Sequence, residues 1–517
     1  MAESRVGNSV RNVFAAWGGQ AVYAVCQFLV RATLIATLAD VFVGLESLFA
    51  SLLTMLSLAD LGVGSAIVFA LYEPLAHDDR ESVKSIMRLF KRCYIVIGIV
   101  IIAIGAVMTP NIHMLLGENA PDIPNLQIYF FCFVLNTGVS YFFSYKGSLI
   151  MADQKSYIVY LIQYAFQIVM ALAQIAVLLL THSYLLFLVC MVSSTLFQNI
   201  VIAYKSNKMY PYLKEKDVQP IDRDVLTGIK KNVAGLMMHK LAGVASTPAS
   251  NLIITLFVGI QTTALYGNYL LVTGALERII IKVFDSIIAS VGNLSAKESE
   301  DRQYEVFQTT FFINAMLYAM VSVALLCCVN PFIDILASPE WRMETVTVVL
   351  IVLLFYVKGM RESGITFTSA YGLFWLTKWK AVLEAVGMPL LALLLVRPLG
   401  INGVLLAGII SSLGISTIYE AWAVYSHGFH KPLRRYPVMF IKYAAVTIVC
   451  GAVAYALCSL IMLPSIVQFF LFGIIGLAVP GAAFALLFGR TREFKEMTGI
   501  TKSVLSRVIN KLPGHRD

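Results

Sequence analysis

Residues 93–108 read CYIVIGIVIIAIGAVM, an unbroken apolar run that directly follows Lys91 and Arg92. As a helix, this run and its largely apolar continuation to residue 116 are long enough to cross the hydrocarbon core of a bilayer. Similar runs recur along the whole chain. Because a backbone in lipid must satisfy its hydrogen bonds internally, the sequence predicts an all-α polytopic membrane protein.

The composition agrees with this fold class and excludes a large soluble module. Of the 517 residues, 59% are hydrophobic and only 13% are charged, with a mean hydropathy of +0.79. Soluble domains carry about 25% charged residues, so this chain has too few charges to cover a water-facing surface. The eight cysteines all lie in apolar stretches without a C-x-x-C pair, which indicates packing residues.

Fourteen apolar segments are long enough to span a membrane. In the first half they are residues 12–38, 42–70, 92–116, 125–152, 157–181, 183–204 and 233–258. In the second half they are residues 263–293, 307–329, 346–369, 380–397, 400–424, 441–463 and 465–489. An even number places both termini on one side. Most of the 39 Lys and Arg lie in loops on that side, so we expect cytoplasmic termini, and the net charge of +9 indicates topology rather than a nucleic-acid partner.

The longest connection, residues 205–232, divides the chain near its middle, and we interpret it as a cytoplasmic hinge loop. Matches between the halves recur at a spacing of about 220 residues, for example Pro110 with Pro331. Parallel repeats of this kind usually enclose a central site. The predicted domains are an N-terminal six-helix bundle (1–204), the hinge loop (205–232), a C-terminal six-helix bundle (233–424), two additional transmembrane helices (425–489) and a basic cytoplasmic tail (490–517). The tail is amphipathic, which predicts a helix on the anionic inner leaflet, with a solvated basic tail as the alternative.

Six basic side chains lie deep inside predicted spans: Arg31, Lys240, Arg278, Lys282, Lys358 and Arg361. Facing lipid, each would cost roughly 2.5–3.5 kcal/mol, so we expect them to face protein or water. Helical spacing groups most of them into three polar stripes. The stripes are Gln20, Gln27 and Arg31; Arg278, Lys282 and Asp285; and Lys358, Arg361 and Glu362. We expect Gln20, Gln27 and Asn136 to line a polar cavity.

The acids at similar depth are counted as Asp60, Glu277, Asp285 and Glu362, fewer than the six cations. The remaining positive charge predicts a cavity that binds a mobile anion, such as a phosphate or pyrophosphate, through charge-assisted hydrogen bonds. Alternatively, the charges form internal ion pairs that only fix the helix register, such as Arg361 with Glu362 or Lys282 with Asp285. Asp60, Asp285 and Glu362 are candidates for ion coupling, and Asp60 could instead form a hydrogen bond between helices.

Pro248 lies in the middle of the predicted span 233–258 and removes a backbone hydrogen bond there. Flanking hydroxyl side chains can satisfy the freed carbonyls, so we expect a kink that acts in gating, with a static kink as the alternative. The sequence contains no P-loop, metal-ligand cluster or nucleophile motif. We therefore expect transport without a cofactor and without enzymatic activity.

Residues 57–79 read SLADLGVGSAIVFALYEPLAHDD, and short motifs follow at residues 266–269 (YGNY), 290–294 (SVGNL) and 371–374 (YGLF). In their order and spacing these stretches resemble Wzx-type oligosaccharide-lipid flippases of the MOP exporter superfamily, over essentially the whole chain. The resemblance implies a MATE-like fold, with the fourteen predicted helices arranged as two pseudo-symmetric six-helix bundles plus two C-terminal helices around a central cavity.

The resemblance also implies a function. Such flippases move undecaprenyl-pyrophosphate-linked oligosaccharide repeat units across the bacterial cytoplasmic membrane by ion-gradient-driven alternating access, for capsule, exopolysaccharide or lipopolysaccharide synthesis. The implied partners are the lipid-linked glycan, membrane lipids, Na⁺ or H⁺, and polysaccharide polymerases and glycosyltransferases, with the six deep cations guiding the anionic head group. The alternatives are a lipid II flippase, a MATE-like antiporter and, in another class, a polytopic polymerase or glycosyltransferase.

Overall fold

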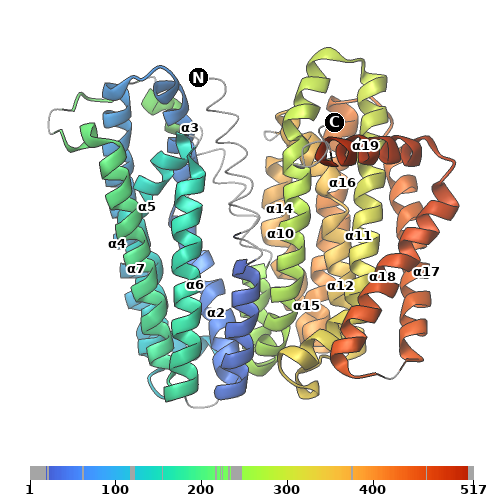
Figure 1. The fold of residues 1–517 in the computed structure, drawn as a ribbon, viewed down its shortest axis with the longest axis horizontal. Coiled ribbons are helices and arrows are strands. Elements are labelled where there is room, and N and C mark those ends of the chain that lie inside the picture. Colours follow the sequence, from blue (N-terminus) through green and yellow to red (C-terminus); the bar gives the residue numbers. More distant parts are fainter. Residues whose placement is uncertain are drawn as a thin grey trace. The chain divides into compact units, whose positions relative to one another are not determined.

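The computed structural model describes residues 19, 22–60, 63–116, 123–153, 155–215, 218–221, 223, 225–230, 233, 247–373, 376–461 and 463–509. Within these residues every regular element is a helix, and nine helices are long and apolar enough to cross a membrane (Figure 1). The prediction of an all-helical, multi-span membrane protein is therefore confirmed. The count of fourteen spanning helices stays a prediction, although each predicted segment carries a helix where the structure describes it.

The chain forms two compact units, Met1–Gly267 and Asn268–Asp517. The first unit contains a helix at Val22–Thr37, α2 (Asp40–Leu56), η1 (Ser57–Asp60), α3 (Val63–Ala76), α4 (Arg80–Met108), η2 (Thr109–Leu115), α5 (Leu126–Ala152), α6 (Ser156–Thr181), α7 (Tyr184–Met209), η3 (Pro211–Lys214) and α9 (Thr247–Phe257). Helix α10 (Ile260–Lys297) begins in the first unit and continues into the second. The second unit also contains α11 (Glu300–Leu336), η4 (Pro339–Trp341), α12 (Thr345–Gly359), α13 (Glu362–Ala370), α14 (Lys378–Leu399), α15 (Ile401–Ser411), η6 (Ser412–Thr417), α16 (Ile418–His427), α17 (Arg435–Ser459), α18 (Ser465–Phe488) and α19 (Arg492–Ile509).

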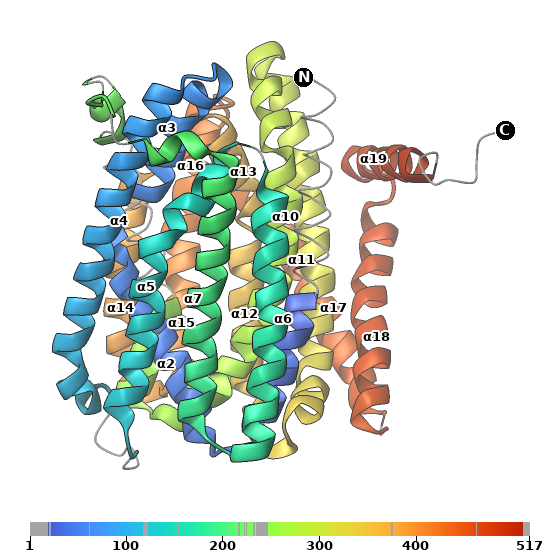
Figure 2. The same ribbon diagram turned by 60° about the vertical axis from the view of Figure 1, so that its left-hand side comes forward.

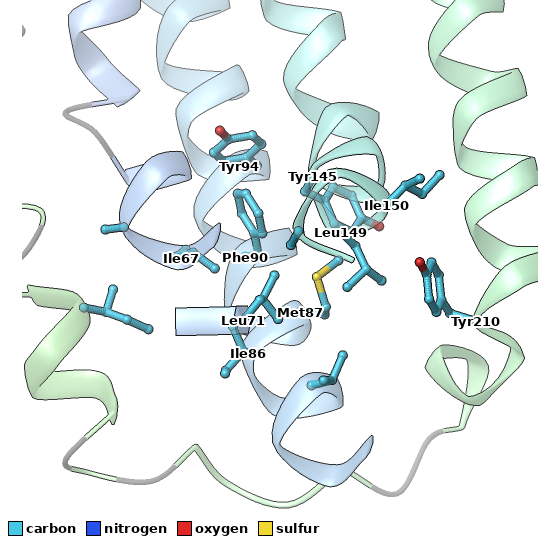
Figure 3. Close-up of a cluster of buried hydrophobic side chains, with 14 of the residues drawn as sticks. Ile67, Leu71, Ile86, Met87, Phe90, Tyr94, Tyr145, Leu149, Ile150 and Tyr210 are labelled. Atoms are coloured by element: carbon cyan, nitrogen blue, oxygen red, sulfur yellow. The ribbon is translucent and has the colours of Figure 1, made fainter. Parts of the chain in front are cut away.

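An apolar cluster joins α3, α4 and α5 in the first unit (Figure 3). Leu71, Phe90 and Leu149 are fully buried in it. Helix α4 begins beside this cluster because the carboxylate of Asp79 accepts the N–H of Ser82 at 3.1 Å, which caps the helix. Since lipid is as apolar as these side chains, close packing rather than removal from water holds such helices together.

Three predicted spans are interrupted helices. Segment 42–70 consists of α2 and α3 separated by the 3₁₀ turn η1, segment 346–369 of α12 and α13, and segment 400–424 of α15 and α16 separated by the π-helical η6. Irregular backbone at membrane depth is tolerated where protein buries it, and it is common near functional sites. Asp60 and Arg361 lie at two of these interruptions, so charged side chains coincide with irregular backbone.

The helix boundaries repeat between the two halves of the chain. Helices α2, α4, α5, α6 and α7 begin at residues 40, 80, 126, 156 and 184, and α10, α11, α12, α14 and α15 begin at residues 260, 300, 345, 378 and 401. Taken in order, the paired starts differ by 217 to 222 residues. The helix caps repeat as well, since Asp79 caps α4 and Ser299 caps α11. These boundaries support the internal repeat that the sequence predicts.

The described part of the connection 205–232 packs on the first unit. The ammonium group of Lys84 on α4 bonds Glu215 at 2.8 Å, and the hydroxyl of Ser85 donates to the carbonyl of Gln219 at 2.9 Å. These contacts fasten the loop to the start of α4.

The boundary between the two compact units falls inside α10, and the predicted domain boundary at the loop 205–232 stays a prediction. Packing of α9 and the start of α10 against α2 gives the physical reason. The side-chain amide of Asn251 donates to the hydroxyl of Ser51 at 2.9 Å. A Cβ atom on Gly44 would lie only 2.5 Å from the carbonyl oxygen of Ile260. The backbones of α2 and α10 therefore come into close contact at this glycine.

Helix α19 is the amphipathic helix predicted in the tail. It runs crosswise to α18 (Figures 1 and 2). The hydroxyl of Thr309 on α11 donates to Glu496 at 2.6 Å, and Arg492 pairs with Glu305 at 2.5 Å. The helix is therefore attached to α11 by polar contacts as well as by its apolar face.

Candidate functional site

Arg31 lies in the helix Val22–Thr37 and is buried against α2. Its guanidinium bonds the carboxylate of Glu46 at 2.5 Å and donates to the hydroxyl of Ser47 at 3.3 Å. Gly267 leaves room for this group, since a Cβ atom there would lie 2.9 Å from a guanidinium nitrogen of Arg31. This first predicted cation therefore already has a carboxylate partner.

Arg361 belongs to a buried ion network in the second unit. Its guanidinium contacts both carboxylate oxygens of Glu420 on α16, at 3.0 and 2.8 Å, and its remaining nitrogen lies 3.5 Å from Glu384 on α14. Lys380 on α14 bonds the same Glu420 and lies 3.8 Å from Glu384. The four side chains are 4–16% exposed. Two cations and two carboxylates balance, so we call Arg361, Lys380, Glu384 and Glu420 the neutral network.

The neutral network corrects the expected pairing of Arg361. The sequence alternative pairs it with Glu362, its neighbour in the chain, whereas the structure places Glu420 against it. The difference arises because α16 packs against α13 and brings the carboxylate of Glu420 to Arg361 from a neighbouring helix.

The sequence count behind the expected excess of cations is incomplete. The sequence count omits Glu46, Glu384 and Glu420, although each lies inside a predicted span. It also omits Lys380, which stands four residues before Glu384, the spacing at which opposite charges meet on one helix face. That local signal could have revealed half of the neutral network from the sequence.

Arg278 and Lys282, in contrast, are exposed, one turn apart on α10. Their neighbours Ile279 and Val283 are 54% and 40% exposed, so an apolar stripe runs beside the cations. Val283 also begins a cavity of about 540 Å³ between α10, α11 and α19. Other residues of its wall are Phe284, Ile287, Met316, Met320, Met497 and Ile500. A ligand with an anionic head and a hydrocarbon tail would find a complement to each part along α10.

Several predicted residues are half-buried. Lys358 lies in the last turn of α12, and Glu362 is the first residue of α13. Glu277 on α10 and Gln27 in the helix Val22–Thr37 are half-buried too. Asn136 on α5 has a buried carbonyl oxygen that accepts no hydrogen bond from the part of the chain that the structure describes, so this oxygen can receive one from a ligand or water.

Other predicted residues are placed only partly. Asp285 lies within α10, where the structure describes its backbone. Gln20 and Lys240 lie outside the described residues. Pro248 is buried and is the second residue of α9, a position in the first helical turn that tolerates proline well. Residues 234–246 in front of it lie outside the described part, so the kink stays a prediction.

Asp60 is the last residue of η1 and is 8% exposed. Its carboxylate accepts the N–H of Gly64 at 3.3 Å, which links η1 to the start of α3. It also lines a cavity of about 410 Å³. Among the described residues, His, Cys, Asp and Glu side chains do not gather in a group of three that could hold a metal ion.

Comparison with known proteins gives structural matches only. A scan against protein-family models and a search of curated proteins return no match. A structure of "Lipid II flippase MurJ, inward closed conformation" superposes with a TM-score of 0.66 at 13% identity, covering 93% of this chain and 99% of that one. An inward-facing multidrug resistance MATE family transporter of the MOP superfamily gives a TM-score of 0.60 at 14% identity, covering 78% and 93%. An outward-facing MATE family transporter gives 0.51 at 13% identity, covering 80% and 94%.

This chain has the fold of MOP-superfamily flippases and transporters. The matched structures are transporters and not enzymes, which is consistent with the expectation of transport. With identities of 13–14%, the likeness concerns the fold and leaves the substrate open.

Proposed function

We propose that this protein is a flippase that moves undecaprenyl-pyrophosphate-linked oligosaccharide repeat units across the bacterial cytoplasmic membrane for surface polysaccharide synthesis. The observation that carries the proposal is the pair of exposed cations Arg278 and Lys282 beside the apolar cavity that begins at Val283. A pyrophosphate accepts strong charge-assisted hydrogen bonds from Arg and Lys, and a polyprenyl chain fits an apolar wall. The positive charges of Arg278 and Lys282 would repel a cationic drug.

The extent of the structural likeness supports a flippase over a MATE-like antiporter. The MurJ structure covers 93% of the chain and the inward-facing MATE structure 78%. A further part of the chain therefore has a counterpart in the flippase but not in that transporter.

The proposed mechanism is alternating access of the two halves, driven by Na⁺ or H⁺, with both termini cytoplasmic. Lys240 and Lys358 are further candidates for contact with the head group. Gln20, Gln27 and Asn136 are proposed to line the polar path, Asp60, Asp285 and Glu362 to couple ions, and Pro248 to act in gating. Arg31 and Arg361 already have carboxylate partners, so we assign them to holding helices together. A polysaccharide polymerase and glycosyltransferases are the expected protein partners.

Reconstitution into proteoliposomes tests the proposal. Polyprenyl-pyrophosphate oligosaccharide is placed in the inner leaflet, and its arrival in the outer leaflet is measured with an impermeant sugar oxidant under an imposed Na⁺ or H⁺ gradient. The double variant Arg278→Ala/Lys282→Ala removes two charge-assisted contacts, and we expect initial rates about 10- to 100-fold lower. Lys442→Ala, which removes an exposed cation from α17, is the control. Equal rates in the double variant and the wild type would refute the proposed head-group site.

Lipid II is the second candidate substrate because the MurJ structure covers nearly the whole of this chain. Lipid II is also a polyprenyl-pyrophosphate glycan, so α10 suits both. The same assay with lipid II in the inner leaflet separates the two substrates, and faster movement of lipid II than of the oligosaccharide would favour the second candidate.

A further inference from the structure

The cavity at Asp60 lies in the first unit, where η1 passes into α3 and both face α4 and α5. Its volume of about 410 Å³ falls in the range of small-molecule sites. The part of the wall that the structure describes combines one buried carboxylate, three aromatic rings and the hydroxyl of Ser148. The mixture differs from the largely apolar wall of the cavity beside Val283, so the two cavities suit different chemistry.

The polar part of the wall is built to exchange hydrogen bonds with a ligand. Asp60 is buried and accepts the N–H of Gly64, and an ionised carboxylate can accept several hydrogen bonds at once. Tyr94 is held by its ring, which packs against Phe90 at 4.6 Å between centroids. Figure 3 shows its hydroxyl pointing away from the apolar side chains around the ring. The cavity therefore offers a carboxylate acceptor next to hydroxyls that both donate and accept.

The aromatic part of the wall lies on one face of α3. Phe69 and Tyr72 are 65% and 50% exposed, and their ring centroids lie 6.1 Å apart at an interplanar angle of 78°. Two exposed rings set edge to face present the face of one ring and the edge of the other to anything that enters beside Asp60. Gly64 lets the hydroxyl of Tyr94 come close to the backbone of α3, since a Cβ atom there would lie 2.0 Å from it.

We propose that this cavity binds a sugar ring of the transported glycan, an inference that rests on the proposed function. A pyranose has C–H faces that pack on aromatic rings and hydroxyls at its edge that donate to a carboxylate. Hard metal cations require about six oxygen ligands at close range, and the described residues of this wall supply one carboxylate. The carboxylate of Asp60, proposed above to couple ions, would in this site accept hydrogen bonds from sugar hydroxyls.

Saturation-transfer NMR on the purified full-length protein in detergent tests the inference, with methyl glycosides of neutral hexoses and N-acetylhexosamines as probes. We expect transfer to the ring C–H protons of at least one glycoside. Tyr72→Ala should lower the signal about 5-fold or more, whereas Tyr72→Phe keeps the ring and the signal. Tyr204→Ala on α7, which removes an aromatic side chain that is 69% exposed, is the matched control and should change nothing. Equal signals for Tyr72→Ala and the wild type would overturn the site.

The charge of Asp60 separates a sugar from a cation. A sugar needs the acceptor oxygen, so Asp60→Asn should bind within about 3-fold of the wild type and Asp60→Ala about 10-fold more weakly. A site for an organic ammonium needs the negative charge, so loss of binding in Asp60→Asn, together with competition by tetramethylammonium, would overturn the inference. Transport of lipid-linked glycan without glycoside binding would refute the sugar site alone. Glycoside binding without transport would refute the proposed function alone.

Discussion

Two sets of basic residues look alike in the sequence and differ in the structure. Arg361 and Lys380 are buried and share the carboxylates of Glu384 and Glu420. Arg278 and Lys282 stand exposed on α10, beside an apolar stripe. Pairing a charge with a carboxylate inside the protein keeps it away from lipid, and Arg361 and Lys380 are paired in this way.

The difference assigns the two sets to different tasks. A buried cation that already holds a bidentate carboxylate would have to leave it before binding substrate, at a cost similar to that of breaking a buried pair. An exposed cation can exchange one contact for another at little cost, because solvent screens its pairs. We therefore assign stability to the neutral network and substrate contact to α10, and the predictions below test that division in decreasing order of expected effect on the free energy of unfolding.

Glu420→Ala should have the largest effect. It leaves Arg361 and Lys380 buried with Glu384 as the remaining carboxylate of the network, and breaking a buried pair costs about 3–5 kcal/mol. The free energy of unfolding, measured by detergent-denaturant titration, should fall by that amount. Replacing the whole neutral network with apolar residues should cost far less, because no charge is then left unpaired. A loss below about 1 kcal/mol in Glu420→Ala would show that the network does not stabilise the second unit.

The Arg31–Glu46 pair should come next. Its side chains are 10% and 31% exposed, so solvent screens it more than the neutral network. A double-mutant cycle with Arg31→Met and Glu46→Gln should give a coupling energy of about 1–2 kcal/mol in unfolding. Arg302 and Glu305, 46% and 36% exposed, form the matched control pair and should couple by about 0.2–0.5 kcal/mol. Equal coupling in both pairs would mean that burial of Arg31 adds nothing.

The helices could be predicted from the sequence to a large extent because apolar runs of this length have few alternatives in a membrane. The positions of the breaks within these helices could not be predicted. The turn η1 at Asp60 and the interruption before Glu362 depend on packing between helices. An apolar run in the sequence indicates the length of a spanning segment. It does not indicate whether the backbone of that segment is a regular helix throughout.

The candidate site was harder to predict for a related reason. Helical spacing relates residues within one helix, so Lys380 and Glu384 could have been paired from the sequence. Arg361 and Glu420 are 59 residues apart on different helices, and only coordinates bring them together. Arg278 and Lys282, in contrast, lie within one helix, so their helical spacing predicted from the sequence that they share one face.

Helix α19 carries a third set of ion pairs, around Glu496, and the stability of these pairs depends on pH. Burial acts to raise the pKa of Glu496, but hydrogen bonds from Thr309, Arg492 and Arg302 outweigh it and lower the pKa below its usual value of 4.5. A depressed pKa stabilises the folded form above the ordinary value, and this stabilisation is lost as pH falls through the depressed value. Below about pH 4.5, α19 should detach more readily by up to about 1 kcal/mol, seen as faster amide hydrogen exchange after correction for intrinsic rates. Glu496→Gln should abolish this pH dependence, and an unchanged dependence in that variant would assign it to another group.

Arg278→Ala/Lys282→Ala should have the smallest effect on stability. Exposed side chains outside a packed core usually change the free energy of unfolding by less than about 0.5 kcal/mol, and separating two like charges one turn apart even favours the helix slightly. In the titration used for Glu420→Ala, this double variant should therefore have nearly the same free energy of unfolding as the wild type, although we expect its transport to be slower. A destabilisation above about 2 kcal/mol would mean that these cations hold the second unit together as the neutral network does. The contrast between the two sets would then fail, because both would act on folding and neither would be reserved for the substrate.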